Sequence, residues 1–155
     1  MKQIFIAARH GSYDDDHNLD SYGKKQMELL AEAVKEAVNG HDLQISLLCS
    51  TAPRAEQGGR ILVEALGIPE NRAVFHECFW DDSYHPGNSQ VARALVEEHL
   101  QDGTLVLALS HLDMAPGLAM FVRTKFGRKD RIDDIGYGQA LMVTPEGVSI
   151  LPRRA

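Results

Sequence analysis

Cysteine is scarce in this chain of 155 residues, and long hydrophobic runs are missing. The two cysteines, Cys49 and Cys78, form neither a CxxC pair nor a zinc-binding pattern, which favours a reducing, cytoplasmic setting over a disulfide-stabilised fold. No apolar segment approaches the ~20 residues that are needed to cross a bilayer, and the N-terminus has none of the features of a signal peptide. We therefore expect no membrane association.

Basic residues are outnumbered by acidic ones. Lysine and arginine together number 16, against 22 aspartates and glutamates, which gives a net charge of −6. This balance disfavours binding to nucleic acid or to an anionic membrane surface, so an anionic ligand would need a local cluster of donors. The remaining composition, 44% hydrophobic and 25% charged, is ordinary for a globular protein, and the length predicts a single domain over residues 1–155.

Apolar residues alternate between strand-like runs and helical spacing along the chain. The pattern predicts strands at 2–8, 44–49, 73–75, 105–109, 140–143 and 148–151, and helices at 21–38, at 54–66, from 89, and from 114 to 126. The fully apolar run at 105–109 indicates a strand that is buried on both faces. We therefore expect a three-layer α/β/α sandwich with a mostly parallel central sheet, and an antiparallel edge strand after the turn at 144–147.

Three of the predicted core strands end in basic or imidazole side chains. Arg9, His10 and Gly11 follow the first strand, Arg54 comes soon after the second, and His111 follows the fourth. Ligands of open α/β sheets bind beyond the carboxyl ends of the parallel strands, so we expect these side chains to converge on one crevice. Guanidinium groups and helix N-termini suit a phosphoryl group, and Gly11 would let the backbone approach such a ligand closely.

Each of these residues also has a purely structural explanation. Arg9 could pair with the aspartates at 14–16, and Arg54 could pair with Glu56 or Glu77. His10 could be a structural histidine after its strand, and His111 could be a hydrogen-bonded histidine at a helix start. The acidic run itself lacks the spacing of a metal site, so we interpret it as a solvated loop. Because such residues recur at three corresponding strand ends, a common site is the favoured interpretation.

The same segments resemble the histidine phosphatase superfamily, which includes the phosphoglycerate mutases. The matching segments are RHG at 9–11, LDSYGKKQ at 19–26, the arginine motif at 50–57 and LSH at 109–111. They occur in the order of the family and extend over almost the whole chain. The short length, with RAEQ at 54–57 and SHL at 110–112, looks most like the small phosphohistidine phosphatases of the SixA type. The resemblance implies a phosphoglycerate mutase-like fold.

The resemblance also implies a set of site residues. His10 would attack phosphorus and form a phosphohistidine intermediate that water then hydrolyses, with no metal or other cofactor. His111 would join it as a second catalytic residue. The phosphate-binding residues would be Arg9, Gly11, Ser12, Arg54 and His111.

Glu77 best matches the position of the acid that the superfamily often uses as proton donor. We expect it to be partly buried beside Phe79 and Trp80, which would raise its pKa as a donor requires. An exposed or arginine-paired glutamate is the structural alternative. Asp81 and Asp82 are weaker candidates for the same role.

The leading hypothesis is a metal-independent phosphatase that acts on phosphohistidine in a protein or on a small phosphorylated metabolite. A phosphomutase of the same superfamily is one alternative, although it needs a closed site and the chain is short for the insertions that would cap one. A catalytically silent module that binds phosphate or a phosphoprotein is another, and a metal-dependent hydrolase is a third. The physiological substrate and the oligomeric state stay open, and the C-terminal residues 152–155 are expected to form a frayed tail.

Overall fold

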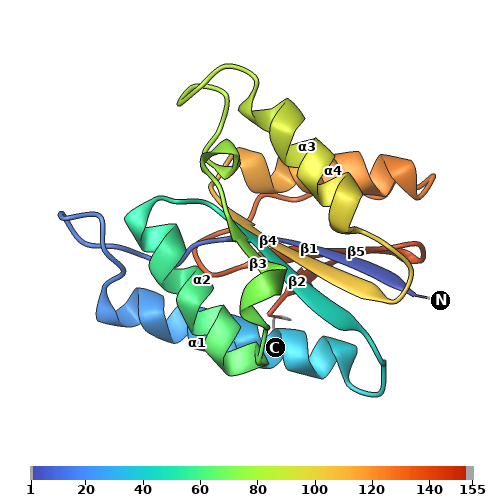
Figure 1. Ribbon diagram of the computed structural model, residues 1–155, viewed down its shortest axis with the longest axis horizontal. Helices are drawn as coiled ribbons and strands as arrows, with labels where there is room; N and C mark the ends of the chain where they lie inside the picture. The colour runs from blue at the N-terminus through green and yellow to red at the C-terminus, as the bar shows by residue number, and fades with distance from the viewer. Residues whose placement is uncertain (1, 153–155) are drawn as a thin grey trace.

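The computed structural model describes residues 2–152, in which strands and helices alternate (Figure 1). The elements are β1 (Gln3–Arg9), α1 (Ser21–Val38), β2 (Gln44–Cys49), α2 (Pro53–Leu66), β3 (Ala73–Phe75), α3 (Asn88–His99), β4 (Thr104–Ser110), α4 (Met114–Lys125), β5 (Ala140–Thr144) and β6 (Gly147–Leu151). The predicted boundaries lie within one residue of these. Two short 3-10 turns, η1 (Glu70–Arg72) and η2 (Glu77–Phe79), were not predicted. The expected tail lies outside the described residues except for Pro152.

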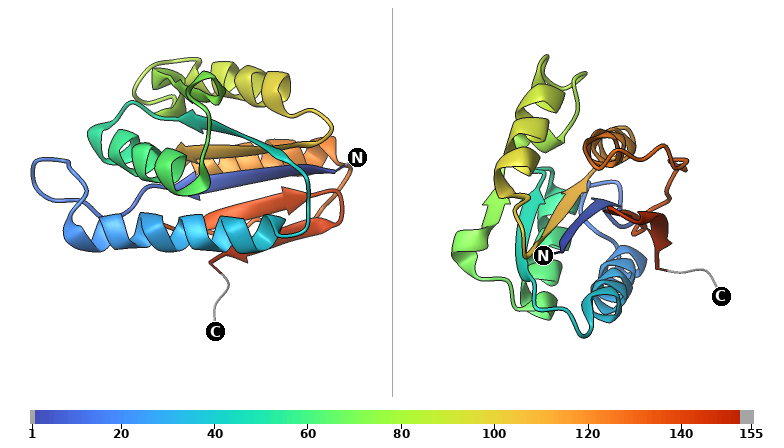
Figure 2. Two further views of the ribbon diagram at one scale, coloured as in Figure 1. Left: turned by 60° about the horizontal axis from the view of Figure 1, so that its bottom comes forward. Right: turned by 90° about the vertical axis from the view of Figure 1, so that its right-hand side faces the viewer.

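The sheet has the strand order β3-β2-β4-β1-β5-β6. Its first four strands are parallel, β5 runs antiparallel to β1, and β6 pairs with β5 as an antiparallel hairpin at the edge. Helices α1 and α2 cover one face of the sheet, and α3 and α4 cover the other (Figures 1 and 2). The expected three-layer sandwich with a mostly parallel sheet is confirmed. None of the helices within residues 2–152 is both long and apolar enough to span a membrane.

The central strand β4 explains the continuous apolar run in the sequence. All seven of its residues are buried. Leu105, Leu107 and Leu109 pack into the core beneath α1 and α2, whereas Val106 and Ala108 pack into the core beneath α3 and α4. A strand between two helical layers has no solvent-facing side, so its sequence shows no polar alternation.

The register of the parallel strands brings the predicted site residues to one level. Arg9 at the end of β1 is the partner of Ser110 at the end of β4, and Cys49 at the end of β2 is the partner of Leu109. The segments that follow these three adjacent strands therefore begin side by side at the same edge of the sheet. The convergence expected from topology follows from this register.

The loop after β1 packs directly against the first turn of α1. A Cβ atom added to Gly11 would overlap the carbonyl oxygen of Gly23, and one added to Gly23 would overlap the carbonyl oxygen of Ser12. We expected glycine at position 11 because it would let the backbone approach a ligand closely, and this explanation needs correction. The backbone of α1, and not a ligand, occupies the space that the missing side chain leaves. Together, the two glycines hold the loop that carries His10 against α1.

Substituting alanine for Gly23 should therefore destabilise the fold. We expect Gly23→Ala to lower the free energy of unfolding by about 3 kcal/mol, because the new methyl group meets backbone that cannot move aside. Gly117→Ala in α4 is the matched control, since an added Cβ there meets nothing within 4 Å. It should leave stability unchanged or raise it by about 1 kcal/mol. Urea unfolding of both variants gives the comparison, and equal stabilities would contradict the packing argument.

Candidate active site

His10 lies at the centre of the converging segments, directly after β1. Its side chain is only 3% exposed. Nδ1 lies 2.8 Å from the carbonyl oxygen of Gly11, and the Nε–H group of Arg54 lies 3.2 Å from Nε2. Because a guanidinium group can only donate, Nε2 must accept and Nδ1 must carry the ring proton, which it donates to Gly11. The lone pair of Nε2 therefore faces the arginine side of the site.

The two predicted arginines reach this position from a helix and a strand. Arg54 lies in the first turn of α2, and Arg9 is the last residue of β1. Arg9 donates through Nη1 to the carbonyl oxygen of Ile135 at 3.3 Å, while its buried Nε has no partner within residues 2–152. Neither guanidinium forms an ion pair with any carboxylate of these residues. The alternative that acidic neighbours simply neutralise them is therefore wrong.

His111 faces His10 from the end of β4. The two ring centroids are 5.0 Å apart. Nε2 of His111 is hydrogen-bonded to the hydroxyl oxygen of Ser50 at 2.8 Å, and this oxygen also accepts the backbone N–H of Ala52 at 3.2 Å. The segment between β2 and α2 thus orients His111 and also carries Arg54. The sequence prediction that positions 10, 54 and 111 gather in one place agrees with this geometry.

Burial keeps both imidazoles neutral. Burial, together with the positive charges of Arg54 and Arg9, lowers the pKa of His10 to about 4, against the opposing hydrogen bond to Gly11. Burial, repulsion from His10 once it is protonated in acid, and the charge of Arg54 lower the pKa of His111 to about 3. At neutral pH Nε2 of His10 therefore carries no proton, and its lone pair can attack phosphorus once the hydrogen bond from Arg54 is released to a ligand.

This burial also makes the stability of the fold sensitive to pH. Between pH 6.5 and about 4 the unfolded chain binds a proton at His10 that the folded protein does not, so stability falls as the pH falls through this window. Lowering the pH from 7 to 5 should remove about 2 kcal/mol through His10 alone. Urea unfolding at both pH values measures the loss. His10→Gln should reduce it and His41→Gln, at an exposed histidine, should not; an equal pH dependence in both variants would contradict the assignment.

Three aromatic side chains contact the cluster and a fourth stacks on one of them, and the sequence did not reveal them as a group. They are Tyr13, Trp80, Tyr84 and Tyr137. Trp80 stacks on His111 with ring centroids 5.2 Å apart, and Tyr84 stacks on Trp80 at 4.5 Å. All four lie in loops, where no periodic pattern points to their neighbours. The sequence indicates only that three of them lie in segments that follow a predicted strand and that Tyr137 lies just before one.

The expected environment of Glu77 is wrong. It begins the short turn η2, where Cys78 and Phe79 are buried and Glu77 is exposed. The carboxylate whose charge acts on His111 is instead that of Asp81. Hydrogen bonds from the hydroxyl of Ser83 and from backbone N–H groups lower the pKa of Asp81, so it is ionised at neutral pH.

Ser12 has its donors engaged away from the histidines. Its hydroxyl donates to Asp20 at 2.7 Å and its backbone N–H donates to the side-chain oxygen of Gln26 at 2.9 Å. The same oxygen of Asp20 accepts the N–H of Gly23 and caps α1 at 2.6 Å. Ser12 therefore ties the His10 loop to α1, and its contact with phosphate stays a prediction.

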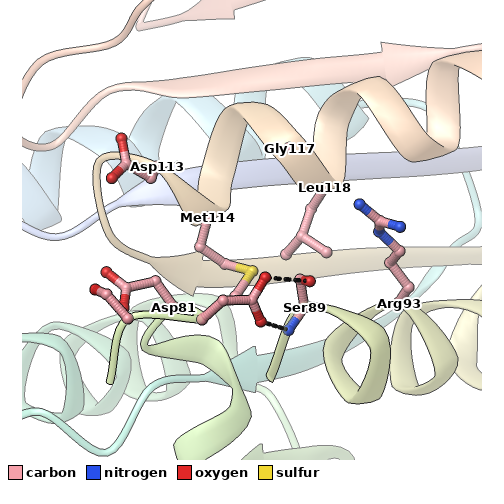
Figure 3. A pocket seen from close by; sticks show the side chains of 9 residues that line it. Asp81, Ser89, Arg93, Asp113, Met114, Gly117 and Leu118 are labelled. Carbon is pink, nitrogen blue, oxygen red and sulfur yellow. Dashed lines mark hydrogen bonds between the residues drawn. The ribbon is translucent and has the colours of Figure 1, made fainter. Parts of the chain in front are cut away.

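A separate cavity of about 320 Å³ lies between α3 and α4, with Asp81 at one end and Arg93 at the other (Figure 3). Asp113, Met114 and Leu118 also line it. His10 and the two site arginines do not line this cavity, so it lies beside the candidate active site and does not contain it.

No protein family model and no curated protein sequence matches the chain. Solved protein structures, in contrast, match the chain over most of its length. The protein histidine phosphatase SixA complexed with tungstate is 19% identical with a TM-score of 0.65, covering 95% of this chain and 93% of that one. A mycobacterial glucosyl-3-phosphoglycerate phosphatase is 15% identical with a TM-score of 0.63, covering 96% and 95%. Phosphoglycerate mutase from Plasmodium falciparum is 15% identical with a TM-score of 0.58, covering 95% and 87%. The chain therefore has the phosphoglycerate mutase-like α/β fold that these proteins share.

Proposed function

We propose that the protein is a phosphatase that uses His10 as its nucleophile. The observation that carries this proposal is the arrangement around Nε2 of His10, where a neutral imidazole faces Arg54 beside a second guanidinium and a second imidazole. Such a cluster favours a tetrahedral oxyanion, because guanidinium groups match its oxygens. Phosphatases are among the solved proteins that share the fold, which supports phosphoester or phosphohistidine hydrolysis.

The reaction proceeds in two displacements. Nε2 of His10 forms a bond to phosphorus while the bond to the leaving group breaks and its electron pair departs with that group. Water then forms a P–O bond and loses a proton to the solvent, and the N–P bond breaks with its electron pair returning to Nε2. The N–H of Nδ1 stays bonded to the Gly11 carbonyl, which stabilises the positive charge on the phosphorylated ring.

Arg9, Arg54 and His111 stabilise the phosphoryl oxygens during both displacements. Phosphoryl transfer requires mainly in-line alignment and compensation of negative charge on the equatorial oxygens. The two guanidinium groups supply positive charge that no carboxylate within residues 2–152 offsets at ion-pair distance. His111, neutral and held by Ser50, supplies a hydrogen bond when its ring proton faces the ligand.

The site restricts which leaving groups can depart. Asp81 is ionised at neutral pH and cannot donate a proton. Substrates whose leaving group departs without strong protonation, such as the imidazole of phosphohistidine, should therefore react faster than alkyl phosphates. We expect kcat/KM for a phosphohistidine protein to exceed that for glycerol phosphate by about 10²-fold or more, since this is the usual contribution of a general acid. Comparable values would contradict the inference.

Glu77 can be tested with the same pair of substrates. If it donates a proton to the leaving group, Glu77→Gln should slow hydrolysis of the alkyl phosphate and leave that of phosphohistidine unchanged. Its exposed position favours a small effect on both. An equal and large loss on both substrates would exclude a role confined to protonating the leaving group.

Trapping of the intermediate tests the proposed function directly. The protein is incubated with phenyl phosphate or with a phosphohistidine protein, quenched without acid, and examined by intact and peptide mass. Acid-labile phosphate on His10, with release of inorganic phosphate, is the expected result. Phosphate binding without a phosphoenzyme or turnover would identify a silent binding module. Return of the phosphoryl group to an organic acceptor in place of water would identify a phosphomutase.

A further inference from the structure

Both arginines of the site rest on aromatic rings. The guanidinium carbon of Arg9 lies 4.1 Å from the ring centroid of Tyr137. That of Arg54 lies 4.7 Å from the centroid of Tyr13 and 5.5 Å from that of Trp80. These distances are within the range in which a cation is attracted to the face of an aromatic ring.

The aromatic rings also pack against neighbouring side chains other than the arginines. Tyr13 and Tyr137 meet at an interplanar angle of 89° with centroids 5.9 Å apart, and each lies within 6 Å of the His10 ring. Trp80 has an anchor of its own, since its indole N–H donates to the hydroxyl of Thr51 at 3.0 Å. Each guanidinium is thus held by rings that have their own packing partners.

A carboxylate would hold an arginine equally well, but with a different electrostatic result. An ion pair orients the guanidinium and also offsets its charge. Arg60, further along α2, has both kinds of partner, because its guanidinium carbon lies 4.3 Å from the ring centroid of Phe75 and its Nη1 lies 3.7 Å from the carboxylate of Glu70. An aromatic face orients the cation through its quadrupole and carries no net charge. The charges of Arg9 and Arg54 therefore stay available to a ligand.

We propose that Tyr13, Trp80 and Tyr137 are positioning residues that hold Arg9 and Arg54 for a dianionic phosphoryl group without neutralising them. This inference rests on the proposed function, because it assigns to the same site the support of its anion-binding groups. It explains how a chain with a net charge of −6 keeps two adjacent, uncompensated positive charges in a partly buried site.

Binding of inorganic phosphate, measured by titration calorimetry, tests the proposal. Tyr137→Leu should weaken binding about tenfold, whereas Tyr137→Phe, which keeps the ring, should stay within about twofold of the original protein. Tyr137→Glu should bind phosphate more weakly than Tyr137→Leu, because a carboxylate holds Arg9 but offsets its charge. Tyr22→Leu is the control, at a tyrosine that is 68% exposed on α1, and it should bind phosphate normally.

Thermal unfolding without ligand separates positioning from a general loss of structure. The proposal expects the Leu variants to lose phosphate affinity while their unfolding temperatures stay close to that of the original protein. If Tyr137→Leu does not fold, Tyr13→Leu and Tyr13→Phe provide the same comparison at Arg54. Unchanged phosphate affinity in a folded Leu variant would overturn this inference and leave the proposed phosphatase intact. Absence of phosphate binding in the original protein would overturn both.

Discussion

His10→Asn is expected to lower kcat/KM by at least about 10⁴-fold and to eliminate the phosphoenzyme. An amide nitrogen has no lone pair that can attack phosphorus, so the first displacement cannot begin. The side-chain amide can still donate to the Gly11 carbonyl as Nδ1 of the imidazole does, which keeps the loop after β1 in place. Initial rates on phenyl phosphate and on a phosphohistidine protein, together with the mass of the trapped protein, measure the effect.

Two comparisons make this result specific to the nucleophile. His41→Asn changes an exposed histidine and should leave both the rate and the phosphoenzyme unchanged. The His10 variant should still bind inorganic phosphate, because Arg9, Arg54 and His111 remain. Readily measurable turnover by His10→Asn in a preparation free of other phosphatases would contradict the assignment of the nucleophile.

The arrangement of the backbone could be predicted from the sequence because it follows from burial. A strand such as β4, apolar at successive positions, requires a helical layer on each face, and strands separated by helices pair in parallel. Parallel pairing places the ends of β1, β2 and β4 at one edge, so the proximity of His10, Arg54 and His111 follows from topology alone. No knowledge of side-chain conformation was needed.

The support of the site could not be predicted in this way. Tyr13, Trp80 and Tyr137 lie in loops, where apolar residues follow neither the repeat of a helix nor that of a strand. Which of these rings come into contact is therefore decided only when the chain folds. The environment of Glu77 could not be predicted from the sequence either. A 3-10 turn directs successive side chains about 120° apart, so the burial of Cys78 and Phe79 turns Glu77 toward solvent. Sequence proximity to buried aromatic residues was therefore a poor guide to its environment.

Arg54→Lys is expected to lower kcat/KM by about 10²- to 10³-fold although it keeps the positive charge. The guanidinium group presents a planar set of donors, and its Nε–H, which lies 3.2 Å from Nε2 of His10, turns to the phosphoryl group when Nε2 attacks, so that Arg54 can bind two phosphoryl oxygens in parallel. An ammonium group is a single point of charge on a flexible chain and cannot bind two oxygens in this way. Arg60→Lys, on the exposed side of the same helix, is the matched control and should leave the rate unchanged.

The pH profile separates the geometry of Arg54 from its charge. In Arg54→Lys the positive charge still disfavours the imidazolium form of His10, so the acid limb of kcat/KM should stay at the pH of the original protein. In Arg54→Met the charge is lost, the pKa of His10 rises toward its ordinary value, and the acid limb should move to higher pH. Burial, the larger cause, remains in both variants and keeps the shift partial. An acid limb that moves equally in both variants, or a Lys variant as active as the original protein, would show that Arg54 does not act on His10 as the structure indicates.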